Sequence, residues 1–407
     1  MPTDHHQPAA SVLPRFGLSR MKPRDPNEPH RAASPLELFF DLVFVVAVAF
    51  SSAQLHHMET HGHAAEGVVG YLMIFFAIWW AWMNFTWFAT SFGTDDWLYR
   101  VLTVLQMGGV LILAAGASRA MEEGDFSLGV IGYIIMRLAL VGQWLRAAAN
   151  NPEYRPTAYR YAIGIVIIQV MWVGYLFVPK SLGVIAFIVL ALIEISVPLF
   201  AESKKTTPWN AHHITERYGL FTLILLGESI LASTNAVVDA IETGHHLNDL
   251  LIISGSGLLI AAGMWWVYFA REHHEHIDGI RSSVTFGYFH YFIFAAAGAF
   301  SAGIEVAIDY IGGEAHLNEI VGAATLSVPV AVFFLAVWWL TLRKSLSGVG
   351  SGFFLLGVAV MAAAVVVPGV WSVTAVAVGA ILSVVAVEVG SRAGSGLADE
   401  ATLGQFN

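Results

Sequence analysis

Long apolar runs, separated by short polar stretches, fill the chain from residue 35 to residue 390. Each run is about 20 residues long, which is the length of an α-helix that crosses a hydrocarbon layer of ~30 Å. A strand of a membrane β-barrel needs only about half that length, so the pattern predicts an all-α, polytopic membrane bundle. We expect twelve membrane-spanning helices, at residues 35–55, 66–90, 97–117, 127–148, 158–178, 181–200, 211–235, 250–270, 284–308, 319–341, 351–368 and 369–390. The proline in VVVPGVW leaves open whether the last two are one bent span.

The composition supports this class and excludes others. Hydrophobic residues make up 57% of the chain and charged residues only 12%, against about a quarter charged in soluble domains. The formal net charge of -10, without a basic stripe, argues against a nucleic-acid partner. The chain has no Cys, which excludes disulfides, a thiolate nucleophile and a cysteine zinc site. We therefore expect the lipid bilayer as a partner and no cofactor.

The pattern divides the chain into four parts. Residues 1–34 are polar and rich in proline, which predicts a disordered cytoplasmic tail. Two six-helix repeats are expected at 35–200 and 201–390, followed by a cytoplasmic tail at 391–407.

The two repeats are inferred from self-similarity. ELFFDLVFVVAVAF at 37–50 resembles ERYGLFTLILLGES at 216–229, and IWWAW in the second span resembles MWWVY in the eighth. Six spans per copy is an even number, so both copies should face the same way. Parallel repeats of this kind are common among secondary transporters, which hold a solute between the two copies.

Basic residues predict the orientation. With twelve spans, 17 of the 20 Lys and Arg fall on the side of the N-terminus, Arg119 and Lys180 fall on the opposite side, and Arg137 lies within a span. Short cytoplasmic loops of membrane proteins carry an excess of Lys and Arg. We therefore expect a bacterial inner-membrane protein with both termini in the cytoplasm.

Two acids lie one helical turn apart where the first span begins. Ser34 and Glu37 form a capping box with a proline at the first helical position, so Glu37 has a structural explanation. Asp41 lies one turn further in, where no capping role reaches it. An ionised acid inside a membrane is costly, so Asp41 should point into the bundle and either titrate or pair with a group such as His290 or an arginine of a neighbouring span.

The seventh span carries a second charged stripe. Glu216 and Arg217 lie at its start, where we expect structural roles, and Glu228 lies about 16 Å further along on the same face as Arg217. Glu228 therefore needs a partner from another helix, or it is protonated.

Arg137 lies near the middle of the fourth span and cannot lose its proton. It therefore requires an acid from another helix. The sequence leaves four candidates: Glu228, Glu194, Asp41 and Glu305.

Histidines form the remaining signal. His290 and Glu305 share one face of the ninth span, and His290 should lie at about the depth of Asp41. Histidine-rich stretches, LHHMETHGH and ETGHH, follow the first and seventh spans, in loops that we expect on the outer side. Imidazoles can bind zinc or copper, but surface loops with several histidines usually do not, so no metal is expected.

The segments ELFFDLVFV and ERYGLFTLILLGESI make the chain resemble the bacterial low temperature requirement A (LtrA) family. The tryptophan-rich second span and the His-then-Glu pattern of the ninth span agree, and the resemblance covers about residues 35–390. It implies a multi-pass bacterial membrane protein of a family named for a cold-growth phenotype, without established catalytic residues. On the family's motifs it places only positions, at Asp41, Glu216, Arg217, Gly227 and Glu228.

The repeat and the intramembrane charges favour a secondary transporter of an unknown small solute, with proton coupling as the candidate mechanism. Six residues are candidates for a substrate or proton pathway: Asp41, Arg137, Glu194, Glu228, His290 and Glu305. The alternatives are a membrane-embedded enzyme, a lipid-active or stress-adaptation protein without transport activity, and a channel, sensor or assembly factor. Enzyme activity is the less favoured of these classes, and no catalytic residue is assigned.

The orientation is testable with reporter fusions. A reporter fused after residue 63 should lie outside the cytoplasm and one fused after residue 206 inside, because the distribution of Lys and Arg places these loops on opposite sides. Alkaline phosphatase and fluorescent-protein fusions measure this. Finding both positions on the same side would contradict the twelve-span topology.

Overall fold

The computed structural model describes residues 17–28, 31–243, 246–271, 277 and 279–403. Over these residues the chain is helical and contains no strand, which confirms the predicted all-α bundle. The long helices are α1 (Pro35–Thr60), α2 (Ala64–Phe92), α3 (Trp97–Ala115), α4 (Ser127–Asn150), α5 (Arg155–Tyr175), α6 (Gly183–Glu202), α7 (Ala211–Thr243), α8 (Leu247–Phe269), α9 (Ile280–Gly312), α10 (Glu319–Leu340), α11 (Gly348–Ala363) and α12 (Trp371–Leu403).

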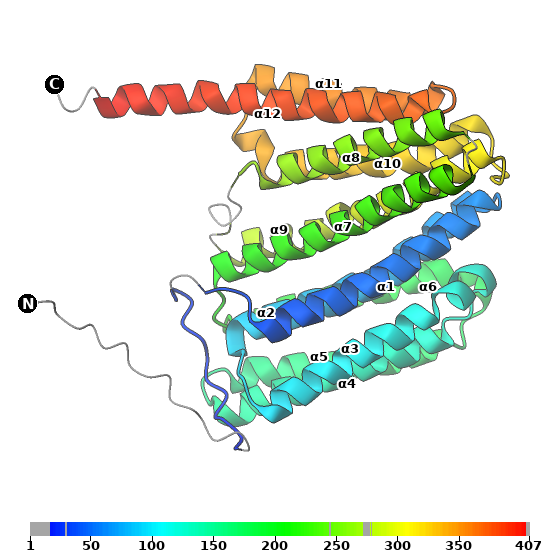
Figure 1. Ribbon diagram of the computed structural model, residues 1–407. Coiled ribbons are helices and arrows are strands. Elements are labelled where there is room, and N and C mark those ends of the chain that lie inside the picture. The colour runs from blue at the N-terminus through cyan, green and yellow to red at the C-terminus, as the bar shows by residue number, and fades with distance from the viewer. Residues whose placement is uncertain (1–16, 29–30, 244–245, 272–276, 278, 404–407) are drawn as a thin grey trace, which may run out of the picture.

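Eleven helices in the described part of the chain are long and apolar enough to cross a membrane. The remaining long helix, α7, packs against α8 and α9 and runs alongside them (Figure 1). The segment that sequence left open between residues 351 and 390 forms two helices, because α11 ends in a single 3-10 turn (Ala364–Val366) before α12 begins. Gly369, between this turn and α12, has a φ of 57°, a left-handed conformation that glycine adopts without strain.

The helices form two groups that lie side by side (Figure 1). We call α1–α6 the first half and α7–α12 the second half. The second half has additional contacts, chiefly of α8 with α12, that have no counterpart of similar extent in the first half. Other pairs of neighbours pack in both halves: the first helix with the second and the third, the second with the fourth, and each helix from the third onward with its successor. This pattern agrees with the proposed repeat, which stays a prediction. The two halves meet where α1 and α2 contact α7 and α9.

We call the end of the bundle where α1 begins the N side. The segment expected to be a disordered tail crosses this end, since Met21 is fully buried and Arg24 N donates a hydrogen bond of 2.9 Å to Ser91 O. Arg31 donates to the backbone oxygens of Ala89 (2.7 Å) and Thr90 at the end of α2, where carbonyl groups lack helical partners. Burial lowers the pKa of Arg31 to about 10, so the guanidinium stays protonated at neutral pH. Residues 17–28 and 31–34 are therefore held against the bundle.

Candidate functional site

Two charged pairs face each other across the boundary between the halves. Glu37 and Asp41 are four residues apart on α1, and His213 and Arg217 are four residues apart on α7. Residues with this spacing share one face of a helix, so each pair presents both side chains to the other helix. We call these four residues, with Trp82 of α2, the interface ion cluster.

Asp41 and Arg217 form the core of the cluster, and both side chains are fully buried. Arg217 donates from Nε to Asp41 Oδ2 at 3.0 Å and from Nη2 to Asp41 Oδ1 at 2.5 Å. Trp82 Nε1 donates a further hydrogen bond of 2.6 Å to Oδ1. The carboxylate therefore makes a bidentate contact with the guanidinium, the geometry that makes arginine a strong partner for an acid.

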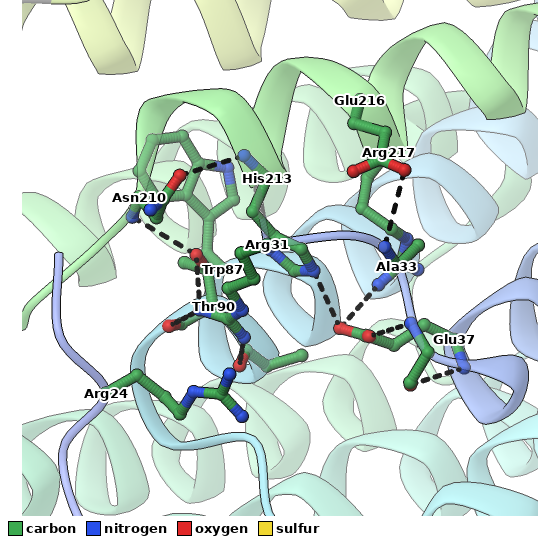
Figure 2. A network of polar contacts seen from close by, with 12 residues as sticks. Arg24, Arg31, Ala33, Glu37, Trp87, Thr90, Asn210, His213, Glu216 and Arg217 are labelled. Carbon is green, nitrogen blue, oxygen red and sulfur yellow. Dashed lines mark hydrogen bonds and ion pairs between the residues drawn. The ribbon is translucent and has the colours of Figure 1, made fainter. Parts of the chain in front are cut away.

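Glu37 has two roles. Its Oε2 accepts a hydrogen bond of 2.8 Å from Ser34 N, and Ser34 Oγ accepts one of 3.3 Å from Glu37 N, which is the predicted capping box. The other oxygen, Oε1, lies 3.2 Å from Arg217 Nη1 and 3.2 Å from His213 Nε2 (Figure 2). Neither contact has hydrogen-bond alignment, and the one with His213 is an ion pair only when His213 is protonated. Capping alone is thus an incomplete account of Glu37.

The position of Arg217 also differs from expectation. We counted it among the basic residues of the N side, but its side chain is fully buried between the halves. Glu216 does lie at the N-side surface, where its Oε1 is 3.4 Å from Ala33 N (Figure 2). A charge at the start of an apolar run does not show from sequence alone whether it faces water or a partner helix.

Arg137 pairs with Glu194, one of its four candidate acids. The guanidinium Nη2 is 3.3 Å from Glu194 Oε1, and both side chains are almost fully buried. Tyr133 and Trp172 donate hydrogen bonds of 2.6 and 2.8 Å to the two oxygens of Glu194. This second ion pair joins α4 and α6 within the first half and does not touch the interface ion cluster.

A third cluster lies at the opposite end of the boundary between the halves. His56 Nδ1 is 3.1 Å from Glu305 Oε2, and His56 Nε2 is 2.6 Å from Asp309 Oδ2. Thr60 Oγ1 donates to the same Asp309 oxygen at 3.2 Å. The sequence placed His56 in a loop, which is wrong, because α1 continues to Thr60. Glu305 therefore pairs with a histidine and not with Arg137.

The other two candidates lie apart from these clusters. His290 is buried, and its ring nitrogens lie 2.9 Å from Tyr268 Oη and 2.7 Å from Phe286 O, so it is not the partner of Asp41. Glu228 is half-buried and forms no ion pair with any other described residue.

The described residues contain no group of three or more His, Cys, Asp or Glu side chains placed to hold a metal. His245 of the second histidine-rich stretch lies outside the described residues.

Sequence reasoning missed His213, Trp82 and Asp309. His213 lies four residues before Arg217, and Asp309 four residues after Glu305, so helical spacing from a known charge was the available signal for both. Trp82 carried no such signal, because one indole among several in α2 looks like the rest.

The comparison with protein families agrees with this architecture. The model of the family described as bacterial low temperature requirement A protein (LtrA) matches residues 32–389. The chain belongs to the LtrA family. The interface ion cluster, the Arg137–Glu194 pair and the cluster around His56 all lie within the matched range. An uncharacterized protein of Rhizobium meliloti (strain 1021) is 30% identical over 255 residues, which is 60% of this chain and 60% of that protein.

The interface ion cluster predicts a large cost for losing Arg217. Arg217→Ala leaves two buried carboxylates without their main countercharge, which should lower the free energy of unfolding by about 3 to 5 kcal/mol. The melting temperature of the purified protein in detergent measures this. Adding Asp41→Asn to Arg217→Ala should restore part of the loss.

The matched control is Arg100→Ala. Arg100 pairs with Asp95 at the N side, with both side chains mostly exposed (60% and 74%), so its loss should change the melting temperature little. Equal shifts for Arg217→Ala and Arg100→Ala would contradict the assignment of Arg217 to a buried pair.

Proposed function

We propose that this LtrA protein is a proton-coupled secondary transporter of a small solute, in which the interface ion cluster is the contact that opens and closes the N side. The observation that carries the proposal is the position of the cluster. Asp41 and Arg217 join α1 to α7, the first helices of the two halves, in the buried contact between them. In transporters built from two such halves, one half rocks against the other.

The charges of the cluster supply a place for a proton. The directly paired groups are two carboxylates, one arginine and one histidine, so their charges balance when one proton is held at His213 or Glu37. Arg31 is close by, but it directs its guanidinium at the carbonyls of α2. The hydrogen bonds of Asp41 are well aligned, whereas the contacts of Glu37 with His213 and Arg217 are not. Glu37 and His213 are therefore the members that can rearrange at the least cost.

The cluster around His56 supplies a matching contact at the opposite end. It joins α1 to α9, again across the two halves, through Glu305 and Asp309. Alternating access requires one end to separate while the other stays closed. Polar bridges at both ends of one boundary meet that requirement, because each can be exchanged for contacts with water when its end opens.

An apolar band separates the two ends. Phe44, Val48 and Ser52 follow Asp41 along α1 and are buried, with exposed fractions of 0%, 2% and 3%, and Ser52 contributes a hydroxyl to this otherwise apolar band. Gly298 of α9 packs against this band, since a Cβ on Gly298 would lie 2.9 Å from Val48 Cγ1 and 3.2 Å from Ser52 Oγ. The close approach of α1 and α9 supports the proposal, because a transporter needs a seal between its two ends.

An enzyme fits less well. A catalytic acid must reach its substrate. Asp41 and Glu194, the most deeply buried acids among the six candidates, are fully buried and already engaged by an arginine and by hydrogen bonds. These contacts favour structural and switching roles over attack on a substrate.

Accessibility of the apolar band tests the proposal. The chain has no Cys, so Ser52→Cys introduces its only thiol. In proteoliposomes, a membrane-impermeant maleimide should label this thiol, because the halves separate transiently. Asp41→Asn should raise the labelling rate from the N side by about threefold or more, since it weakens the contact that closes this side.

Phe50→Cys is the matched control on the same helix. Phe50 is 60% exposed on the surface of α1, where lipid is expected, so a water-soluble reagent should not label it from either side. Failure of Ser52→Cys to react from either side, in both the parent and the Asp41→Asn background, would contradict alternating access.

A further inference from the structure

A cavity lined by aromatic side chains lies at the N side, next to the boundary between the halves. It has a volume of about 60 Å³ and is lined by residues of α2, α4, α5, α6, α9 and the segment that joins the halves. Water needs about 10 to 15 Å³ by this measure, so the cavity has room for a small organic group. Five aromatic residues and one acid define it: Trp87, Trp144, Tyr161, Trp209, Tyr288 and Glu202.

The aromatic walls are held by packing and hydrogen bonds. Trp144 and Tyr161 stack with ring centroids 4.1 Å apart, and both are largely buried. The ring centroids of Trp87 and Trp209 lie 5.9 Å apart. Tyr288 donates its hydroxyl hydrogen to Ile195 O at 2.8 Å. The walls are therefore in place before any ligand arrives, which reduces the entropy lost on binding.

Glu202 supplies the acid of the cavity. Its Oε1 accepts hydrogen bonds from Tyr161 Oη (2.9 Å) and Thr207 Oγ1 (2.8 Å), and its Oε2 accepts one from Thr207 N (2.7 Å). All of these donors are neutral. In the described part of the chain, no Lys, Arg or His lies within ion-pair distance of Glu202. An ionised Glu202 therefore has no countercharge from the protein.

The nearest basic residues in sequence have other partners. Arg160 donates to Ser203 Oγ at 3.1 Å, with its guanidinium carbon 5.1 Å from the ring centroid of Phe200. Lys205 pairs with Glu153, and its Nζ lies 4.8 Å from the ring centroid of Tyr154. Neither Arg160 nor Lys205 therefore supplies a positive charge to Glu202 in the cavity.

We infer that this cavity binds a small organic cation of the alkylammonium class. Aromatic faces attract such cations, and an acid without a countercharge adds to the attraction. Clusters of Trp and Tyr around a cavity of headgroup size are the arrangement that recognises quaternary ammonium groups. The binding site stands on its own geometry, whereas its role as the site of the transported solute rests on the proposed function.

The cavity is linked to the interface ion cluster through Tyr218. Trp87 Nε1 donates a hydrogen bond of 3.2 Å to Tyr218 Oη, and the ring of Tyr218 lies 4.8 Å from that of Trp82. Trp82 in turn donates to Asp41. A cation bound against Trp87 is therefore separated by two side chains, Tyr218 and Trp82, from the pair that closes the N side.

Direct binding tests the inference without requiring transport. Radiolabelled tetramethylammonium should bind saturably to the purified full chain in detergent, and choline should compete. Its neutral analogue 3,3-dimethylbutan-1-ol should compete at least about tenfold more weakly, because it has the shape without the charge. Glu202→Gln should weaken binding by about tenfold or more.

Two control variants make the result specific. Glu153→Gln removes an exposed acid of the same side that does not line the cavity, so binding should be unchanged. Trp209→Leu should weaken binding while Trp209→Phe keeps most of it. Should Glu202→Gln fail to give a folded protein, the Trp209 pair decides.

Three results would overturn the site: no saturable binding to the parent protein, equal competition by the neutral analogue, or equal binding by Glu202→Gln and Glu153→Gln. If the cation binds but the Ser52→Cys thiol does not react with the maleimide from either side, the binding site stands and only the proposed transport function is contradicted.

Discussion

The buried pair of Asp41 and Arg217 is the constraint on which the arrangement of the two halves depends. Neither charge is tolerated alone in an apolar bundle, because the desolvation of each costs several kcal/mol. Their two-pronged contact, completed by Trp82, therefore fixes α1, α2 and α7 relative to one another. Since replacement by apolar residues is often as stable as a buried ion pair, stability alone does not explain why such a pair is present.

Under the proposed function, the pair is present because its contacts can be exchanged for contacts with water when the N side opens. Glu37 and His213 extend it toward the N side with contacts that lack hydrogen-bond alignment, so this end of the cluster can reorganise before the core pair separates. The His56 bridge at the opposite end and the band between them complete a boundary with two polar ends and a mainly apolar middle. The aromatic cavity adjoins this boundary through Trp87, which connects the proposed solute to the proposed gate.

The sequence predicts the membrane helices well because the bilayer imposes a length and a composition on each of them. It also predicts the capping box at Ser34 and Glu37, because both partners lie within one turn. That Arg137 needs an acid follows from its depth alone. The choice of Glu194 does not, since it depends on which faces of α4 and α6 meet, and a single sequence holds no record of contacts between distant helices.

The remaining differences have the same physical origin. Arg217 and Arg31 looked like solvated charges at the N side, but burial depends on what packs over them. His56 was assigned to a loop because a helix can continue past the apolar run that crosses the membrane. The aromatic cavity was not predictable, because its walls come from five helices and a connecting segment.

The most direct measurement is the distance between the halves at the N side, with and without the Asp41 carboxylate. Arg100 and Lys344 are both exposed. Spin labels at Arg100→Cys and Lys344→Cys report this distance by pulsed electron paramagnetic resonance (EPR) spectroscopy, in a chain without other thiols. Asp41→Asn should lengthen or broaden it by ~5 Å or more, as expected for one half rocking against the other. A reference pair at the opposite end, Arg119→Cys and Glu314→Cys, should not lengthen. Identical N-side distances in the parent and in Asp41→Asn would contradict the claim that this ion pair holds the two halves together.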